Sequence, residues 1–163
     1  MLMTDFTKSV VVPFDFSELS IEALRRTLEM VNDPSRVKVI YVSQYPSVNE
    51  YGVIWDTVTP ETIMQNLHSA FQDELENVEG SSKVDFRVIF GSPGPEIASF
   101  AEEEQAELIV MPSHGRSGFS HFLLGSVAEK VLRLASCPVL VLKDLQGNAL
   151  PTNKSKSANL VAI

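Results

Sequence analysis

Short apolar runs alternate with helical patterns along most of the 163-residue chain. The first run, 9–14, contains three consecutive valines and does not alternate with polar residues, which is typical of a strand buried on both faces. Further strand-like runs follow at 37–42, 84–90, 107–111 and 138–142, separated by segments with apolar residues at helical spacing. This order predicts an α/β fold with a parallel sheet and helices on both faces.

The helical segments have recognisable ends. Either Asp15 or Ser17 is suited to cap the first helix, and an Asn-Asp-Pro-Ser breaker ends it. Residues 44–59 show no sustained period, so we expect a long loop there. Residues 91–96 predict a rigid turn before the third helix. The predicted helices cover 20–32, a segment beginning at Pro60, 96–105, and a segment after Ser126 with apolar positions Val127, Val131, Leu132 and Leu134.

The length of the chain is enough for one domain with a full core. We expect this domain to cover residues 1–146. From 147 to 163 the chain is mostly polar before a short apolar end. That composition predicts a C-terminal tail that is flexible, or is ordered only against a partner.

Composition excludes several classes of protein. The net charge of −8 argues against a nucleic-acid partner, because phosphate backbones require a basic surface. No run approaches the roughly 20 apolar residues of a membrane span, and the N-terminus lacks the pattern of a signal peptide. The one cysteine, Cys137, can form no internal disulfide. These features favour a cytoplasmic protein.

The segment 109–131 joins a strand to a helix through a glycine-containing loop. The first turn of a helix has unpaired N–H groups and the positive end of the helix dipole, which together favour anions. Gly115, Gly118 and Gly125 allow the backbone to bend and approach a ligand, and Ser126 offers a hydroxyl as a cap or phosphate ligand. The pattern fits a phosphate-binding loop, and an ordinary sharp strand–helix turn is the alternative.

Ligands of open α/β sheets bind beyond the carboxyl ends of the strands, where the strand order reverses. If the first and fourth strands are neighbours at that reversal, residues 13–15 and 111–125 line the same crevice. The chain has neither a Gly-x-x-x-x-Gly-Lys-Ser/Thr motif nor a Gly-x-Gly-x-x-Gly motif after the first strand. The three histidines and the cysteine lack the spacing of a metal site.

Three signatures carry a resemblance to a known family. They are Val10-Val-Val-Pro-Phe-Asp-Phe-Ser17, Gly91-Ser-Pro-Gly-Pro-Glu-Ile97, and the segment 108–131 followed by Cys-Pro-Val-Leu-Val at 137–141. Over residues 8–143 the sequence resembles the universal stress proteins. The resemblance implies a single doubly wound sandwich, with a five-stranded parallel sheet in the order 3-2-1-4-5 and about four helices on both faces.

ATP-binding members of this family carry Gly-x-x-Gly, nine residues, and then Gly-Ser or Gly-Thr. Gly115, Gly125 and Ser126 fit that pattern, but Pro112 replaces the first glycine. Proline has no N–H and a fixed φ. If the lost N–H were a phosphate ligand, affinity would fall about ten- to a hundredfold. If the position contributes only a carbonyl and packing against ribose, the cost is small.

The resemblance implies an ATP site between the first and fourth strands, with Mg²⁺ as a possible companion of the phosphates. Asp15 would hold the adenine, Met111 and Pro112 would lie along the ribose, and Arg116 could reach a terminal phosphate. The implied site residues are Pro13, Phe14, Asp15, Val42, Met111, Pro112, Gly115, Arg116, Gly125, Ser126 and Val127.

The function implied by the resemblance is that of a cytoplasmic stress-response protein that binds ATP and acts as a nucleotide-dependent regulatory or interaction module. Two alternatives remain: a nucleotide-free homodimeric interaction protein, and a slow ATPase that uses the same loop. No catalytic residues can be assigned, since no nucleophile or carboxylate is placed beside His114, which we expect to bond the loop backbone.

The fifth strand is an apolar edge, which is a liability when left open. Self-pairing there would cover it, and the resemblance likewise implies a homodimer through this strand. The strand residues are Val139, Leu140, Val141 and Leu142.

Overall fold

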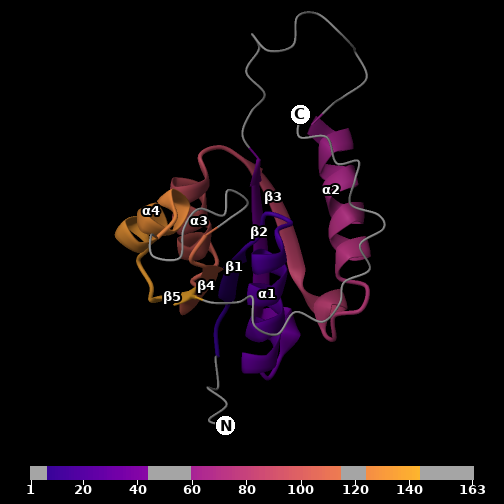
Figure 1. Ribbon diagram of the computed structural model, residues 1–163, viewed down its shortest axis with the longest axis horizontal. Helices are drawn as coiled ribbons and strands as arrows, with labels where there is room; N and C mark the ends of the chain where they lie inside the picture. Colours follow the sequence, from indigo (N-terminus) through magenta and orange to yellow (C-terminus); the bar gives the residue numbers. More distant parts are fainter. Residues whose placement is uncertain (1–6, 44–59, 115–123, 144–163) are drawn as a thin grey trace, which may run out of the picture.

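The computed structural model describes residues 7–43, 60–114 and 124–143. Five parallel strands form one sheet (Figure 1). In chain order they are β1 (Val10–Pro13), β2 (Val37–Ser43), β3 (Asp85–Phe90), β4 (Leu108–Pro112) and β5 (Val139–Leu142). Their order across the sheet is β3-β2-β1-β4-β5, which confirms the predicted topology.

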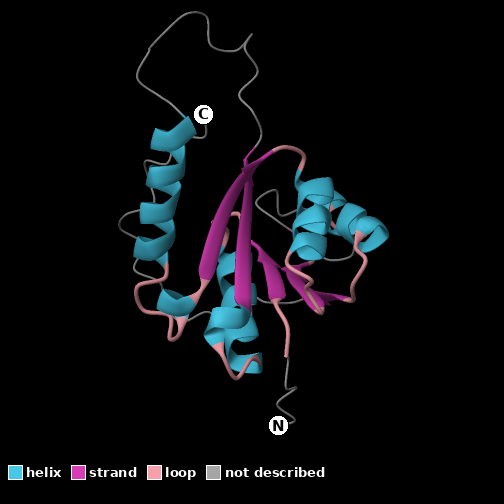
Figure 2. Cartoon of the chain, turned by 180° about the vertical axis from the view of Figure 1, so that it is seen from behind, coloured by secondary structure: helices cyan, strands magenta, loops and turns pink. Residues whose placement is uncertain are grey.

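Helices cover both faces of this sheet. They are α1 (Glu18–Met30), α2 (Pro60–Glu74), α3 (Pro93–Glu103) and α4 (Ser126–Leu134), with short 3₁₀ helices η1 (Pro34–Arg36) and η2 (Ser81–Lys83). Figures 1 and 2 show α3 and α4 together on one side of the sheet, with α1 and α2 on the other.

The central strand β1 explains the two-layered core. Val10, Val12 and Phe14 pack with α1 and α2, whereas Val11 packs with α3 and α4. The three valines have no exposed surface. A strand with apolar side chains on both faces must be covered on both faces, so the unbroken valine run determines the position of β1 in the middle of the sheet.

Two predicted helix starts are resolved by the structure. Ser17 caps α1, because its hydroxyl accepts a hydrogen bond from the Ser20 N–H at 3.2 Å. The prediction of a turn over 91–96 is wrong from residue 93 onward, because α3 already begins at Pro93. The first turn of a helix has N–H groups without intrahelical acceptors, so a proline there costs no hydrogen bond and its fixed φ suits the helix.

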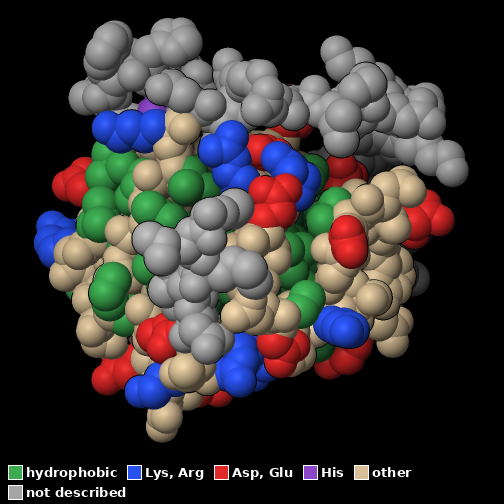
Figure 3. Space-filling view, turned by 90° about the horizontal axis from the view of Figure 1, so that it is seen from below, with side chains coloured by type: hydrophobic (Ala, Val, Ile, Leu, Met, Phe, Trp, Pro, Cys, Tyr) green, Lys and Arg blue, Asp and Glu red, His purple; other side chains and the backbone are tan. Residues whose placement is uncertain are grey.

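The apolar positions predicted for α4 are mostly not core positions. Val131 is fully buried, but Val127, Leu132 and Leu134 are 36%, 45% and 47% exposed. The helix instead packs through Ala128 and Val131, three residues apart on one face. Hydrophobic side chains gather on the left of the molecule in Figure 3, the side on which α4 and β5 lie in Figure 1.

The contact between α3 and α4 depends on Gly94. A Cβ at this position would lie 2.8 Å from three side-chain carbons of Lys130. We expect Gly94→Ala to lower the free energy of unfolding by about 1–3 kcal/mol, because the two helices must separate. Urea unfolding followed by circular dichroism measures the loss. Adding Lys130→Ala, which removes two of the three close carbons, should recover part of it. An unchanged unfolding midpoint in Gly94→Ala would contradict this account.

Candidate functional site

A crevice opens where the neighbouring strands β1 and β4 stop pairing. The register between β1 and β4 extends only to Val11 and Ile109. In contrast, β1 stays paired with β2 as far as Pro13, and β4 stays paired with β5 as far as Pro112. The strand order reverses at this same point, between β1 and β4. The carboxyl ends of these strands therefore form the position at which open α/β sheets bind ligands.

A cavity of about 300 Å³ occupies this crevice. The structure brings nine of the eleven residues implied by the resemblance to its wall, while Gly115 and Arg116 lie outside the described residues. The nine come from the ends of β1, β2 and β4 and from the start of α4. They are Pro13, Phe14, Asp15, Val42, Met111, Pro112, Gly125, Ser126 and Val127.

Seven further residues line the cavity and were not singled out as site residues from the sequence. Ile40 and Ile97 are core positions whose side chains also reach this space, and Pro93 begins α3. Helical spacing predicts that Ile97 faces the core. That it lies beside the ends of β1 and β4 follows only from the order of the strands. The full set is Ser20, Ile40, Pro93, Ile97, Ser113, His114 and Ala128.

The start of α4 presents N–H groups to the cavity. The first hydrogen bond of the helix joins the Glu129 N–H to the Gly125 carbonyl at 2.9 Å. The N–H groups of Ser126, Val127 and Ala128 therefore have no acceptor within the helix. The N-cap residue of α4 is Gly125, which has no side chain to cap this end. All three residues line the cavity, so its wall has the features that bind an anion.

Gly125 has a different role from the one that a phosphate ligand would need. Its N–H donates to the Ser113 carbonyl at 2.8 Å, so it is already used to close the loop. A Cβ at Gly125 would lie 3.1 Å from the same carbonyl oxygen. Gly125 thus allows a close approach between the end of β4 and the first turn of α4.

The loop after β1 is held in a fixed conformation. The Asp15 carboxylate accepts hydrogen bonds from the backbone N–H and the hydroxyl of Ser17. Phe16, between them, has a φ of 62°, which a bulky residue rarely adopts. Its ring packs edge-on against Phe14 and Tyr41, with centroid distances of 5.0 and 5.3 Å. These contacts hold Asp15, which lines the cavity, in one conformation.

His114 makes a different contact from the one expected. Its Nδ1 lies 2.9 Å from the Ser113 hydroxyl, a side-chain partner instead of the loop backbone. Its Nε2 is buried and has no hydrogen-bond partner among the residues that the structure describes. Among the residues that the structure describes, no carboxylate orients the His114 ring, so the Ser113–His114 contact lacks the third member of a catalytic triad there.

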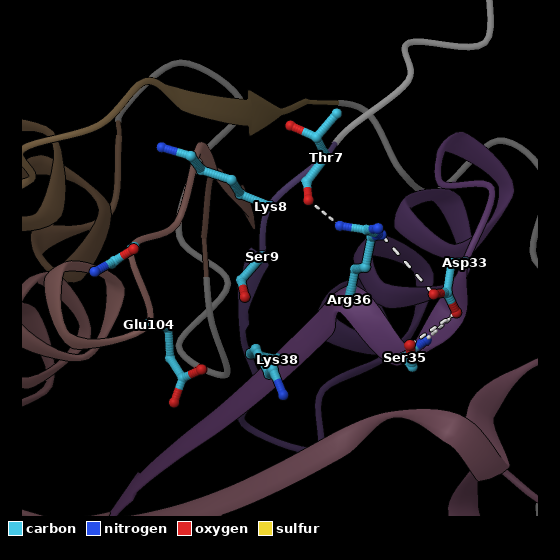
Figure 4. A pocket seen from close by; sticks show the side chains of 9 residues that line it. Thr7, Lys8, Ser9, Asp33, Ser35, Arg36, Lys38 and Glu104 are labelled. Carbon is cyan, nitrogen blue, oxygen red and sulfur yellow. Dashed lines mark hydrogen bonds and ion pairs between the residues drawn. The ribbon is translucent and has the colours of Figure 1, made fainter.

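A second hollow, of about 450 Å³, lies at the opposite end of the sheet (Figure 4). Its wall is polar, and its charged groups are largely paired with one another. The Arg36 guanidinium contacts the Thr7 carbonyl and the Asp33 carboxylate, and Lys38 lies 3.2 Å from Asp85. Lys8 and Lys38 point away from each other (Figure 4). These cations do not converge on one ligand position, so we place the candidate site at the β1/β4 crevice.

Two other kinds of site find no support in the described ranges. No three His, Cys, Asp or Glu side chains there are grouped to hold a metal ion. Burial raises the pKa of the Cys137 thiol, which keeps it protonated and a weak nucleophile.

None of the helices between residues 7 and 143 that the structure describes is long and apolar enough to cross a membrane.

Comparisons with known proteins agree with this architecture. The profile of the universal stress protein family matches residues 7–143. Universal stress protein MJ0531 of Methanocaldococcus jannaschii is 35% identical over 142 residues, which cover 83% of this chain and 82% of that protein.

Solved structures show the same fold. Hypothetical protein MJ0577, also of M. jannaschii, has a TM-score of 0.66 at 28% identity, covering 84% of this chain and 96% of the other. A universal stress protein of Archaeoglobus fulgidus in complex with dAMP has a TM-score of 0.54 at 22% identity, covering 83% and 98%. At that identity the second likeness supports the fold alone.

Proposed function

The chain belongs to the universal stress protein family, and on that premise we propose that it binds ATP in the crevice between β1 and β4. The observation that carries this proposal is the cavity itself, which joins an apolar wall to the N-terminus of α4, where the N-cap residue is a glycine. Its volume of about 300 Å³ is in the range of small-molecule sites. The protein would act as a nucleotide-dependent regulatory module of the cytoplasmic stress response.

The chemistry of the wall suggests how the nucleotide lies. Ile40, Val42 and Met111 offer apolar surface for a purine ring. The Asp15 carboxylate offers acceptor oxygens of the kind to which the exocyclic amine of adenine donates. The phosphates would lie at the first turn of α4, against the N–H groups of residues 126–128. Mg²⁺ would be bound chiefly by the phosphates, as is usual for this ion.

Titration calorimetry of ATP and Mg²⁺ into the purified protein tests the proposal. We expect binding in the micromolar range. Absence of binding to the folded protein would favour a nucleotide-free interaction protein. Saturable phosphate release that a loop variant abolishes would instead favour a slow ATPase.

The two edges of the sheet differ in a way that suggests self-association. On β3, Asp85 and Arg87 are charged and pair with Lys38 at 3.2 Å and with Glu104 at 3.0 Å. Charged side chains protect an edge strand from pairing with another chain. In contrast, β5 consists of valine and leucine only, and β4 is its one neighbour among the strands that the structure describes. We therefore propose a homodimer through Val139, Leu140, Val141 and Leu142.

Replacing Leu140 with lysine should convert this dimer into monomers in sedimentation velocity experiments. The new charge would be buried without a partner at the interface, at a cost that exceeds what one strand pairing supplies. Ser35→Lys adds the same charge at an exposed position on η1 and should leave the dimer intact. A Leu140→Lys protein that remains dimeric would mean that another surface holds the subunits together.

A further inference from the structure

Two prolines, Pro13 and Pro112, lie on the two sides of the crevice. Each is the last residue of an interior strand, Pro13 of β1 and Pro112 of β4. Proline inside a sheet normally removes a ladder hydrogen bond and is confined to edges or bulges. The directions in which the two nitrogens point explain why both prolines are tolerated here.

The direction in which the Pro112 nitrogen points follows from the hydrogen bonds of its neighbours on β4. Along a strand, successive backbone N–H groups point to opposite sides. The N–H groups of Ile109 and Ser113 donate toward β5, to the carbonyls of Pro138 at 3.0 Å and Leu142 at 2.9 Å. The nitrogen of Pro112 therefore faces β1. Its carbonyl also faces β1, because a trans peptide directs it away from the Ser113 N–H.

The same reasoning applies to Pro13 on the other side. The Phe14 N–H donates to the Ile40 carbonyl of β2 at 2.9 Å. The nitrogen and the carbonyl of Pro13 consequently face β4. Pairing between β1 and β4 has already stopped at Val11 and Ile109, so neither proline removes a ladder bond. The two residues present carbonyl oxygens to the crevice and no N–H.

We propose that Pro13 and Pro112 make the middle of the crevice a subsite that only accepts hydrogen bonds, so that it selects ribonucleotides with free ribose hydroxyls. This inference rests on the proposed function. If the base lies on the apolar wall and the phosphates lie at α4, the sugar that joins them lies between these prolines. The 2′- and 3′-hydroxyls can donate to the two carbonyls.

The same subsite disfavours two related ligands. A 2′-deoxynucleotide leaves an acceptor in the crevice without a donor, which costs more than the bond alone contributes. A 3′,5′-cyclic nucleotide lacks the 3′-hydroxyl and places anionic phosphate oxygens near two carbonyl oxygens, and neither proline has an N–H that could compensate. In both cases we expect binding about tenfold weaker than that of the matching nucleotide with both hydroxyls.

Displacement of labelled ATP by AMP, 2′-deoxyAMP and 3′,5′-cyclic AMP tests the inference. AMP should displace at about tenfold lower concentration than either of the others. Pro112→Ala returns one N–H that faces the crevice. The affinity for cyclic AMP should therefore rise several-fold relative to that for AMP, whereas the affinity for 2′-deoxyAMP relative to AMP should stay unchanged. Pro138→Ala makes the same chemical change outside the cavity and should alter neither ratio.

The outcomes separate this inference from the proposed function. If cyclic AMP or 2′-deoxyAMP displaces ATP from the wild-type protein as well as AMP does, the selectivity is wrong and the ATP site still stands. An unchanged cyclic AMP ratio in folded Pro112→Ala overturns the role of that proline. If labelled ATP itself does not bind, the proposed function fails and takes this inference with it.

Discussion

Replacing Phe71 with alanine should lower the free energy of unfolding by about 3–5 kcal/mol. Phe71 is 5% exposed and stacks on Phe86, with ring centroids 4.0 Å apart and planes 4° from parallel. It also meets Phe14 edge-on, with a centroid distance of 5.2 Å. Because Phe14 lies at the end of β1 and Phe86 lies in β3, this one ring ties α2 to two strands. Its removal leaves a cavity that the sheet cannot close.

Urea unfolding followed by circular dichroism measures this loss. His68→Ala is the matched control, because His68 lies on the same helix and meets the edge of Phe86 at 5.0 Å, but is exposed. Surface changes of this kind usually cost no more than about 0.5 kcal/mol. Equal costs for the two variants would mean that the aromatic rings do not hold α2 on the sheet.

The sequence predicted the sheet because the signals for its strands are local. A run such as 10–12, three valines with no polar residue between them, can be buried only in the interior of a sheet. The start of α3 was harder to predict. Pro93 and Pro95 resemble a turn in isolation, and only the hydrogen bond from the Glu96 N–H to the Ser92 carbonyl shows that the helix has begun.

The apolar residues of α4 show where a local pattern fails. Helical periodicity marks Leu132 and Leu134 as candidates for burial but contains no information on which neighbours cover the helix. Gly94 allows α3 to pack closely against Lys130, and the sheet is reached through Ala128 and Val131. Coverage of a helix is a tertiary property, so Leu132 and Leu134 stay exposed in the single chain.

The candidate site was predictable in part for the same reason. Residues such as Asp15 and Ser126 lie in short motifs, so a resemblance can carry their roles. Ile40 and Ile97 belong to no such motif and join the cavity only through the order of the strands. The sequence alone shows that Pro112 has no N–H. The side of β4 to which its nitrogen faces follows from the hydrogen bonds between β4 and β5. From that direction we infer a selective sugar subsite instead of a damaged phosphate site.

Replacing Gly125 with valine should weaken ATP binding at least a hundredfold. The Cβ would lie 3.1 Å from the Ser113 carbonyl oxygen, which also accepts the Gly125 N–H at 2.8 Å. The bulk of valine forces this closure apart and moves the first turn of α4 away from the phosphates. Loss of two charge-assisted hydrogen bonds, at about 1.5 kcal/mol each, is enough for a hundredfold effect.

The matched control for Gly125→Val is Ser126→Ala. It removes one hydroxyl and keeps every N–H group of the first turn, so we expect a loss of no more than about tenfold. Titration calorimetry gives both affinities, and circular dichroism checks that each variant is folded. A larger loss in the control would assign the phosphates to the hydroxyl of Ser126 and not to the backbone of α4. Binding that survives in both variants would place the nucleotide away from this helix, since no ligand could contact the first turn and remain indifferent to its displacement.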